Sequence, residues 1–386
     1  MPKEMLGNVI ETQKGYAFKS QDYLLQGTGI VRVSDFTEDS ICTDNIVYIN
    51  NELAKKYQQY KLARNDVIIQ TVGSWPTNPQ SVVGKVIKVP EVANGFLLNQ
   101  NAVKIIPNKG IALKYIYYLL KNKDFTGFII SCARGAANQA SITLDDIKSY
   151  QFNLPDLKIQ EKIAIVLSNY DDLIENNNKR IKILEEMAQE LYKEWFIDFK
   201  FPKHEATSIK DSELGTIIML QKGKNITKAT IRRGNIPVVA GGLTPAYYHD
   251  IPNTKAPVIT ISASGANAGF VNLYHNDVWA SDCSYIDKTI TKNVYYYYLL
   301  LKSNQVEITN MQLGAAQPHV YPRDIARLKI KVFDEKVIEL FDGLVTPFFE
   351  EIKNLTSKNE VLKQTRDLLL PKLISGEIDV ENLEIV

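Results

Sequence analysis

Two segments of the chain carry apolar side chains with the spacing of a helix seam. The first series occupies positions 163, 167, 170, 174, 177, 181, 184, 188, 191 and 195. The second occupies positions 341, 345, 348, 352, 355, 359, 362, 366, 369 and 373. Both series alternate steps of four and three residues, with charged residues between, which is the pattern of a two-helix coiled coil. The sequence therefore predicts two long helices that pack against each other.

Ten residues are placed at the seam of this pair. They are Ile174, Asn177, Ile181, Leu184 and Leu191 in the first helix, and Ile352, Leu355, Asn359, Leu362 and Leu369 in the second. Asn177 and Asn359 interrupt the two series, and a buried polar residue at such a position lowers stability and tends to fix the register. Pro347 lies inside the second series and should kink or break it, so that helix is expected to begin near Pro347. The alternative is that each segment covers a globular core, but two matched segments favour mutual packing.

The segments that precede the two helices have a different pattern. Runs such as GIVRVSDF, NDVIIQTV and APVITISAS are short, rich in β-formers and separated by Gly, Pro, Asn and Asp. Short helices are expected at 111–123 and 292–303. The predicted fold class is therefore α+β, with two mixed α/β domains separated by two long helices that pair as an antiparallel coiled coil. Such a pair would be a stalk with one domain at each end.

The chain also repeats itself. LGNVIETQKG at 6–15 matches LGTIIMLQKG at 214–223, YYLL at 117–120 matches 297–300, and GAANQASITLDDI at 135–147 matches GAAQPHVYPRDI at 314–325. Because the elements recur in the same order, the chain is a tandem duplication. We divide it into domain one at 1–152, helical region one at 153–202, domain two at 203–332, and helical region two with the C-terminal tail at 333–386.

Composition narrows the class of protein. The chain has 386 residues and a formal net charge of +1, but the charge is +4 over 1–150, −3 over 151–200, +5 over 201–330 and −5 over 331–386. Two mildly basic blocks are a weak indication of a polyanionic partner. No apolar run is long enough to cross a membrane, and no secretory signal is recognised. Three widely spaced cysteines argue against a disulfide framework and favour a cytoplasmic location.

A search for catalytic motifs finds none. The sequence lacks a phosphate-binding GxxxxGK[ST] loop and an adenine-methyltransferase [DN]PP[FYW] turn. The four histidines, His204, His249, His275 and His319, show no metal-ligand spacing. A split nuclease pattern, Pro155-Asp156 with Asp198-Phe199-Lys200, lies at opposite ends of one predicted helix, so its carboxylates cannot meet. We therefore assign no catalytic residue and no metal site.

The layout resembles the specificity subunit of type I restriction–modification systems over nearly the whole chain. The likeness lies in residues 154–202 and 362–378, in the two LG openings and in the two GAA…Q…DI passages. The resemblance implies two target-recognition domains, each specific for one half of a split site in double-stranded DNA, and a coiled coil that sets the spacer. It implies a non-catalytic chain without a cofactor, which assembles with two modification subunits and with restriction subunits. S-adenosylmethionine, ATP and Mg²⁺ are then implied only for those partners.

Candidate DNA contacts are lysines and arginines for phosphates and Ser, Asn, Gln, Arg or His for base edges. In the first domain they are Lys14, Lys19, Arg32, Ser74, Asn78, Arg134, Asn138 and Gln139. In the second they are Lys222, Lys224, Lys228, Arg232, Arg233, Ser264, Asn267, Gln312, Gln317 and His319. For any single lysine among them, a solvated surface charge is the better explanation. Since matched loops hold unlike residues, the full DNA site is expected to be asymmetric.

Two other classes of function stay open. A coiled-coil scaffold that binds only proteins would not need duplicated polar loops on basic domains. A single-chain nuclease or methyltransferase would need motifs that are missing. For the repeated LG phrase, we expect its second glycine to shape a turn and the lysine before it, Lys14 or Lys222, to face the DNA backbone.

Overall fold

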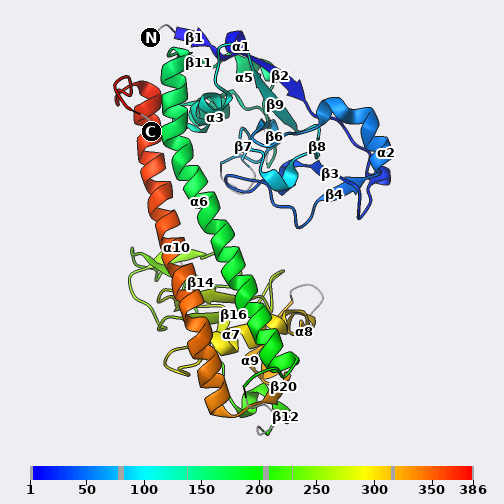
Figure 1. The fold of residues 1–386 in the computed structure, drawn as a ribbon, viewed down its shortest axis with the longest axis vertical. Helices are drawn as coiled ribbons and strands as arrows, with labels where there is room; N and C mark the ends of the chain where they lie inside the picture. The colour runs from blue at the N-terminus through cyan, green and yellow to red at the C-terminus, as the bar shows by residue number, and fades with distance from the viewer. Residues whose placement is uncertain are drawn as a thin grey trace. The chain divides into compact units, whose positions relative to one another are not determined.

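The computed structural model describes residues 3–76, 82–136, 138–202, 208–227, 229–313 and 318–384. The chain divides into two compact units, one made of Met1–Ile174 with Glu360–Val386 and the other of Glu175–Asn359. Each unit therefore contains one globular domain together with part of both long helices. The helices are α6, Leu157–Tyr192, and α10, Glu335–Ser375 (Figure 1).

The two helices run antiparallel within each unit, as predicted. In the first unit Arg366 of α10 pairs with Asp171 of α6. In the second unit Asn177 of α6 contacts Asn359, and Arg180, further along α6, contacts Glu351, which lies earlier in α10. Of the ten seam residues, Ile174, Asn177, Ile352, Leu355 and Asn359 are buried, and Ile181, Leu184, Leu191, Leu362 and Leu369 are half-buried.

The expectation that α10 begins near Pro347 is wrong. The helix starts at Glu335 and continues through the proline. Proline removes one backbone hydrogen bond and normally disrupts a helix interior. Here Phe341, Val345 and Phe349, which flank Pro347, are buried in the core of the second unit. Packing of these side chains holds both flanking turns helical, so tertiary contacts override the local preference.

The described strands of the first unit form two small sheets and two short pairs. They are β1 Lys3–Met5, β2 Ile10–Lys14, β3 Thr28–Val31, β4 Val47–Ile49, β5 Val67–Gln70, β6 Val72–Gly73, β7 Val86–Lys88, β8 Leu97–Leu98, β9 Ala102–Pro107, β10 Ala140–Ser141 and β11 Gln151–Asn153. The sheet orders are β2-β9-β5-β7 and β4-β3-β8, while β1 pairs with β11 and β6 pairs with β10. The β3–β8 pairing is parallel.

The second unit repeats this arrangement. Its strands are β12 Lys210–Glu213, β13 Gln221–Lys222, β14 Ile236–Val239, β15 Tyr247–His249, β16 Val258–Ser262, β17 Val271–Tyr274, β18 Trp279–Ala280, β19 Cys283–Asp287 and β20 Lys329–Val332. The orders β13-β19-β16-β17 and β15-β14-β18, with β12 against β20, match the first unit strand for strand. The β14–β18 pairing is again parallel. The duplication inferred from sequence is therefore a duplication of topology.

Short helices connect the strands of each unit. Those of the first unit are α1 Leu6–Val9, α2 Asn51–Ala54, α3 Leu113–Lys121, α4 Lys123–Cys132 and α5 Leu144–Lys148. Those of the second are α7 Val294–Ser303, α8 Gln305–Asn310 and α9 Pro322–Ile325. The helices α3 and α7 occupy the positions predicted at 111–123 and 292–303. Figure 1 shows α3 between the first sheet and α6, where its buried face joins one core with Leu167 of α6 and Leu373 of α10.

The repeated LG phrase has the same environment in both units. A Cβ on Gly7 would lie 2.9 Å from the Cβ of Lys148, and one on Gly215 would lie 2.8 Å from that of Ala326. A Cβ on Gly15 or Gly223 would fall on a backbone carbonyl oxygen, that of Asn99 or Ser281. None of these glycines has a positive φ. The expected turn-forming role is therefore wrong, and the phrase recurs because each unit requires two close backbone approaches.

We predict that Gly15→Ala and Gly127→Ala have opposite effects. A methyl group added at Gly15 collides with the backbone of Leu98 and Asn99, which cannot rotate away, and overpacking of this kind costs about 1–3 kcal/mol. Gly127 lies inside α4, and a methyl group added there would have nothing within 4 Å, so alanine should add about 0.5–1 kcal/mol of stability. Urea unfolding of both variants measures the difference, and equal effects would contradict the packing argument.

The N-terminus of α7 is capped by a side chain from α10. The buried carboxylate of Asp342 accepts a hydrogen bond from the Tyr296 backbone N–H at 2.8 Å. Burial raises the pKa of Asp342 to about 6, although backbone hydrogen bonds from Tyr296 and Tyr295 oppose the rise. The folded protein therefore binds this proton more tightly than the unfolded chain does.

We predict that Asp342 makes stability fall as the pH rises. Its contribution is fully present below pH 4 and is lost as the pH rises through 6, which amounts to about 3 kcal/mol for a shift of roughly two pKa units. In Asp342→Asn, the amide oxygen can still accept from Tyr296 but does not titrate. The free energy of unfolding of the variant relative to the natural chain should therefore increase from pH 4 to pH 7.

Asp277→Asn is the matched control for this experiment. A hydrogen bond from the Ala256 backbone and the charge of Lys255 lower the pKa of Asp277 despite its partial burial. Its contribution is present at neutral pH and lost in acid, so this variant should show the opposite sign. If both variants changed with pH in the same direction, the assignment of Asp342 would be wrong.

Candidate nucleic-acid interface

Two polar loops of the first unit are joined by short β pairings. The strand β6 pairs with β10, so the loop that follows β5 lies beside the loop that follows α4. An isolated bridge closes each loop on itself, Ser74 with Val82 in the first and Arg134 with Ser141 in the second. The Ile142 N–H donates to the Thr71 carbonyl at 2.9 Å. These pairings bring Ser74, Arg134 and the Asn138–Gln139 pair to one edge of the domain.

The second unit joins the equivalent loops in the same way. Ser264 bridges to His319, and Leu313 bridges to His319 as well. The Val320 N–H donates to the Ala263 carbonyl at 3.0 Å, which repeats the Ile142–Thr71 bond of the first unit. The structure therefore gathers Ser264, Gln312 and His319, three of the residues selected from sequence.

A glycine in the left-handed region ends the first loop in each unit. Gly84 has φ of +82° and Gly269 has φ of +84°, a conformation that favours glycine. Each packs closely on the following short helix, Gly84 against Ile129 and Gly269 against Ile308. Entry and exit of the loop are thus equivalent, whereas its length differs, residues 71–83 in one unit and 263–268 in the other. The sheets and helices that hold the two loops, which we call the frame, are therefore duplicated, whereas the loops themselves differ.

Several predicted residues of the first unit have structural partners. Arg134 forms a two-pronged ion pair with Asp146, at 3.1 and 3.2 Å, and Arg32 pairs with Asp35 at 3.0 Å. Burial raises the pKa of Asp146, but hydrogen bonds from Thr143 and Arg134 outweigh burial and hold that pKa below its usual range. Arg134 is therefore oriented, and its side chain stays about two-thirds exposed.

The other predicted residues of this unit differ in exposure. Lys14, Lys19, Asn138 and Gln139 are exposed, Ser74 is buried, and Asn78 lies outside the described residues. Lys14 and Lys19 belong to the segment around β2, so no described pairing brings them to the two joined loops. Sequence analysis missed a half-buried aromatic cluster beside them. Tyr16, Phe18, Tyr57 and Tyr60 pack with ring centroids 4.5–6.4 Å apart, and the alternation KGYAFK was the available signal.

Some predicted residues of the second unit also have structural partners, and others are exposed. The Ser264 hydroxyl donates to Asp282, the Gln312 amide donates to the Ala268 carbonyl at 2.8 Å, and the His319 ring stacks on Tyr321. Arg232 pairs with Asp250 at 3.0 Å. Lys222, Lys224 and Arg233 are exposed and Asn267 is half-buried, while Lys228 and Gln317 lie outside the described residues.

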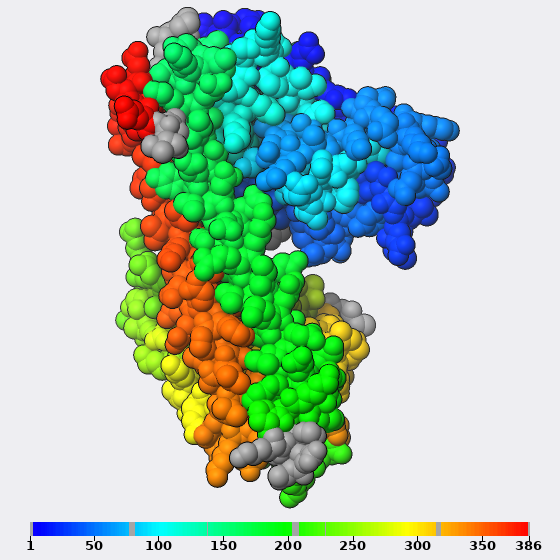
Figure 2. All heavy atoms as spheres, in the orientation of Figure 1, coloured from blue at the N-terminus to red at the C-terminus, as the bar shows by residue number. Residues whose placement is uncertain are grey.

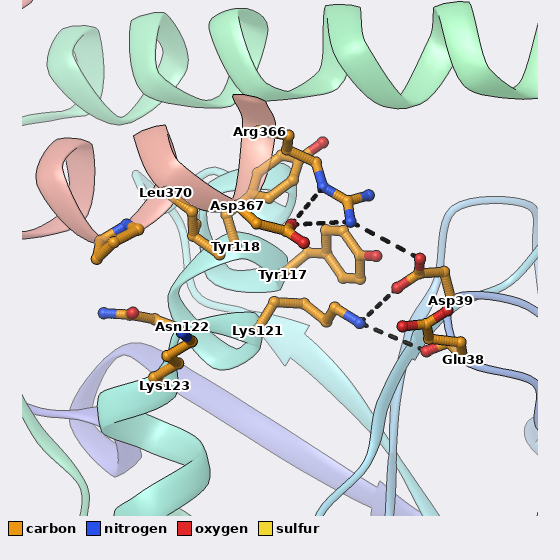
Figure 3. A pocket seen from close by; sticks show the side chains of 11 residues that line it. Glu38, Asp39, Tyr117, Tyr118, Lys121, Asn122, Lys123, Arg366, Asp367 and Leu370 are labelled. Atoms are coloured by element: carbon orange, nitrogen blue, oxygen red, sulfur yellow. Dashed lines mark hydrogen bonds and ion pairs between the residues drawn. The ribbon is translucent and has the colours of Figure 1, made fainter. Parts of the chain in front are cut away.

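A pocket of 240 Å³ in the first unit contains a second polar cluster (Figure 3). Arg366 lies beside it and contacts Asp171 at 2.6 Å, Asp367 at 2.9 Å and Asp39 at 3.8 Å. Burial alone would lower the pKa of the Arg366 guanidinium, but the hydrogen bond and charge of Asp171 raise it. The sequence placed Arg366 at a seam position without assigning it a role.

The described ranges contain no metal-binding cluster and no membrane-spanning helix. No group of three or more His, Cys, Asp or Glu side chains within them could hold a metal ion. No helix in the described part of the chain is long and apolar enough to span a membrane.

The fold and the loops define a class of protein, a duplicated α/β module whose two copies share one frame, carry unlike polar loops and are completed by a pair of long helices. The profile of the type I restriction modification DNA specificity domain matches residues 3–186 and 208–333. The chain belongs to this family, as its sequence predicted, and as a member it is a DNA sequence-recognition protein of a type I restriction–modification system.

Relatives with established names are similar over most of their length. The MjaIX specificity subunit of Methanocaldococcus jannaschii is 30% identical over 323 residues, which cover 75% of this chain and 74% of the relative. The HindI specificity subunit of Haemophilus influenzae is 22% identical, over 76% of this chain and 84% of the relative. The crystal structure of an S subunit from M. genitalium has the same fold, with a TM-score of 0.59 and 18% identity over 97% of this chain and 96% of that one.

Proposed function

We propose that each unit recognises one half of a bipartite DNA site through its two joined loops. The observation that carries the proposal is the duplicated frame with unlike loops, because a shared frame presents two different polar surfaces in equivalent positions. Amide, hydroxyl, guanidinium and imidazole groups are the side chains that distinguish base edges in the major groove. The loops carry Gln139 and Arg134 in one unit and His319 in the other.

We assign the exposed basic residues outside the loops to contact with DNA phosphates. Lys14 and Lys19 in the first unit, and Lys222 and Lys224 in the second, follow the repeated LG phrase and are exposed. Phosphate contacts position a protein on DNA without distinguishing sequence. Arg32 is paired with Asp35 and its side chain is only 28% exposed, so we assign it to the structure of the domain. Arg232 is paired with Asp250 but stays exposed, as Arg134 does, so it remains available for DNA.

The unlike loops lead us to propose an asymmetric site. With Ile142 equivalent to Val320, NQAS at 138–141 in the first unit stands where AQPH stands at 316–319 in the second. A protein with two such surfaces has no reason to bind a palindrome. Methylation profiling of the host genome tests this point, and a perfectly palindromic motif would contradict it.

We assign the helices to assembly with modification subunits and to setting the spacer between half-sites. Large apolar side chains on them are exposed, Ile183 and Met187 in the second unit and Val361 and Leu368 in the first. Figure 2 shows the outward faces of α6 and α10 without a covering of strands on this side. Exposed apolar positions on a helix favour a protein partner. Restriction subunits, S-adenosylmethionine, ATP and Mg²⁺ would enter with the assembled complex, in the cytoplasm.

Two alternative functions make different demands. A scaffold that binds only proteins would show no salt-sensitive preference for one DNA sequence. A single-chain nuclease or methyltransferase would act on DNA without partner subunits. The purified chain, with and without a modification subunit, can be tested for both properties against a set of DNA duplexes.

We predict that Gln139→Ala relaxes recognition of the first half-site only. Loss of one good base contact costs about 1–3 kcal/mol, or roughly 10–100-fold in discrimination at that position. His319→Ala should relax the second half-site instead. Competition binding against duplexes with single base changes measures both effects, in complexes with a modification subunit.

Lys14→Ala is the control for these two variants. It should weaken binding to every sequence alike and reduce the slope of log affinity against log salt by about one. If Gln139→Ala behaved like Lys14→Ala, the assignment of base recognition to the joined loops would fail.

We predict that one extra helical turn in both α6 and α10 lengthens the spacer and leaves both half-sites unchanged. A turn adds about 5.4 Å, which corresponds to one or two base pairs at about 3.4 Å each. Methylation mapping of the assembled complex identifies the new site. An altered half-site sequence would contradict the proposal that the domains recognise the half-sites and the helices set the spacer.

A further inference from the structure

The two long helices carry different side chains at equivalent buried positions. Residues of α10 correspond to residues of α6 with an offset of 178, as the two seam series show. Side-chain contacts agree with this alignment, since Tyr118 donates to Asp171 in the first unit and Tyr298 packs on Phe349 in the second. Under this correspondence Asp171 matches Phe349, Asn177 matches Leu355, Asn359 matches Ile181 and Arg366 matches Ala188.

The first polar contact joins Arg366 to Asp171. The guanidinium donates to the carboxylate at 2.6 Å, and the two side chains are only 10% and 12% exposed. The Tyr118 hydroxyl donates to the other oxygen of Asp171 at 2.6 Å. Figure 3 shows Arg366 from α10 facing Asp39, which is itself paired with Lys121 at 2.6 Å. The charges in this cluster are therefore matched.

The second polar contact lies in the other unit and joins Asn177 to Asn359. The Asn177 amide donates to the Asn359 oxygen at 2.8 Å, and the Asn359 amide donates to the oxygen of Asn178 at 2.8 Å. Asn177 and Asn359 are buried. Each amide thus depends on the opposite helix for its hydrogen bond.

We propose that these two contacts make α6 select α10 and reject a second copy of itself. In an antiparallel pair of two α6 helices, Asp171 would face Ala188 of the other copy and Asn177 would face Ile181. In a pair of two α10 helices, Arg366 would face Phe349 and Asn359 would face Leu355. Every one of the four polar side chains would then lose its partner across the helix pair. Breaking a buried ion pair leaves a charge without compensation, which is strongly destabilising.

A duplicated chain benefits from such a device because part of its apolar seam cannot discriminate between the two helices. Ile174 corresponds to Ile352, Leu184 to Leu362 and Leu191 to Leu369, so these positions are identical in the two helices. Correct and incorrect pairings therefore bury the same side chains there. Specificity between similar partners arises from polar groups that only the correct partner satisfies. The inference rests on the fold alone and does not depend on DNA recognition.

The test replaces each polar residue by the residue at the equivalent position of the other helix. The full chain carries Asp171→Phe, Asn177→Leu, Asn359→Ile and Arg366→Ala together, which leaves Asp39 and Lys121 paired with each other. Sedimentation equilibrium should show a self-association constant at least about tenfold above that of the natural chain, because pairing between copies is no longer penalised. A folded variant with unchanged self-association would overturn the proposal.

Two simpler sets of variants keep the test decisive if the fourfold variant does not fold. Arg366→Ala alone should lower the melting temperature by about 10 °C, since Asp171 loses its closer cation and keeps only Lys88 at 3.9 Å, and added Asp171→Phe should restore it. Asn177→Leu with Asn359→Ile should raise the melting temperature and also increase self-association. A stabilised Asn variant that associates no more than the natural chain would overturn the proposal. Ile174→Val with Ile352→Val is the matched control, which changes the seam without changing its polarity and should leave association unchanged.

Discussion

Both long helices complete the core of each unit, and the rest of the structure depends on that contact. In the first unit the α10 segment comes from the distant end of the chain, whereas the second unit is the continuous stretch Glu175–Asn359. Leu370 and Leu373 of α10 are buried in the same core as Leu6 and Leu167 of the first unit. Tyr192 and Trp195, at the end of helical region one, share the core of the second unit with Phe341. Neither domain has a complete core without both helices, so helix pairing and domain folding are one process.

This arrangement explains why the chain is duplicated so faithfully in some places and so freely in others. The close-packed glycines, the sheet orders and the loop-closing Gly84 and Gly269 recur because each is required by packing. The loops between them place some residues, such as Val83 and Ala268, in the cores and expose others, such as Asn138 and Gln139, so the exposed side chains can differ without altering the packing. A packed frame with variable loops is a general way to alter binding specificity without altering the fold.

Polar groups between the two helices affect which helices pair, whereas those in the loops concern binding. An apolar seam supplies most of the stability of paired helices but is indifferent between two similar partners. The Arg366–Asp171 and Asn177–Asn359 contacts add little net stability, because the groups must lose their water, yet they are satisfied in one pairing only. Burying these groups therefore favours the pairing in which each of them has its partner.

The sequence by itself determined the duplication, the α+β class, the antiparallel helices and the family, because periodic spacing and repeated motifs are properties of the chain order. It also located Arg134, Ser264 and His319 in the loops that the fold joins. Only the tertiary structure decided that α10 continues through Pro347, that the repeated glycines serve close packing, and that Arg366 is matched by Asp171 and Asp39. These features depend on residues far apart in the chain, and local preference contains no information about which distant side chain supplies the compensating contact.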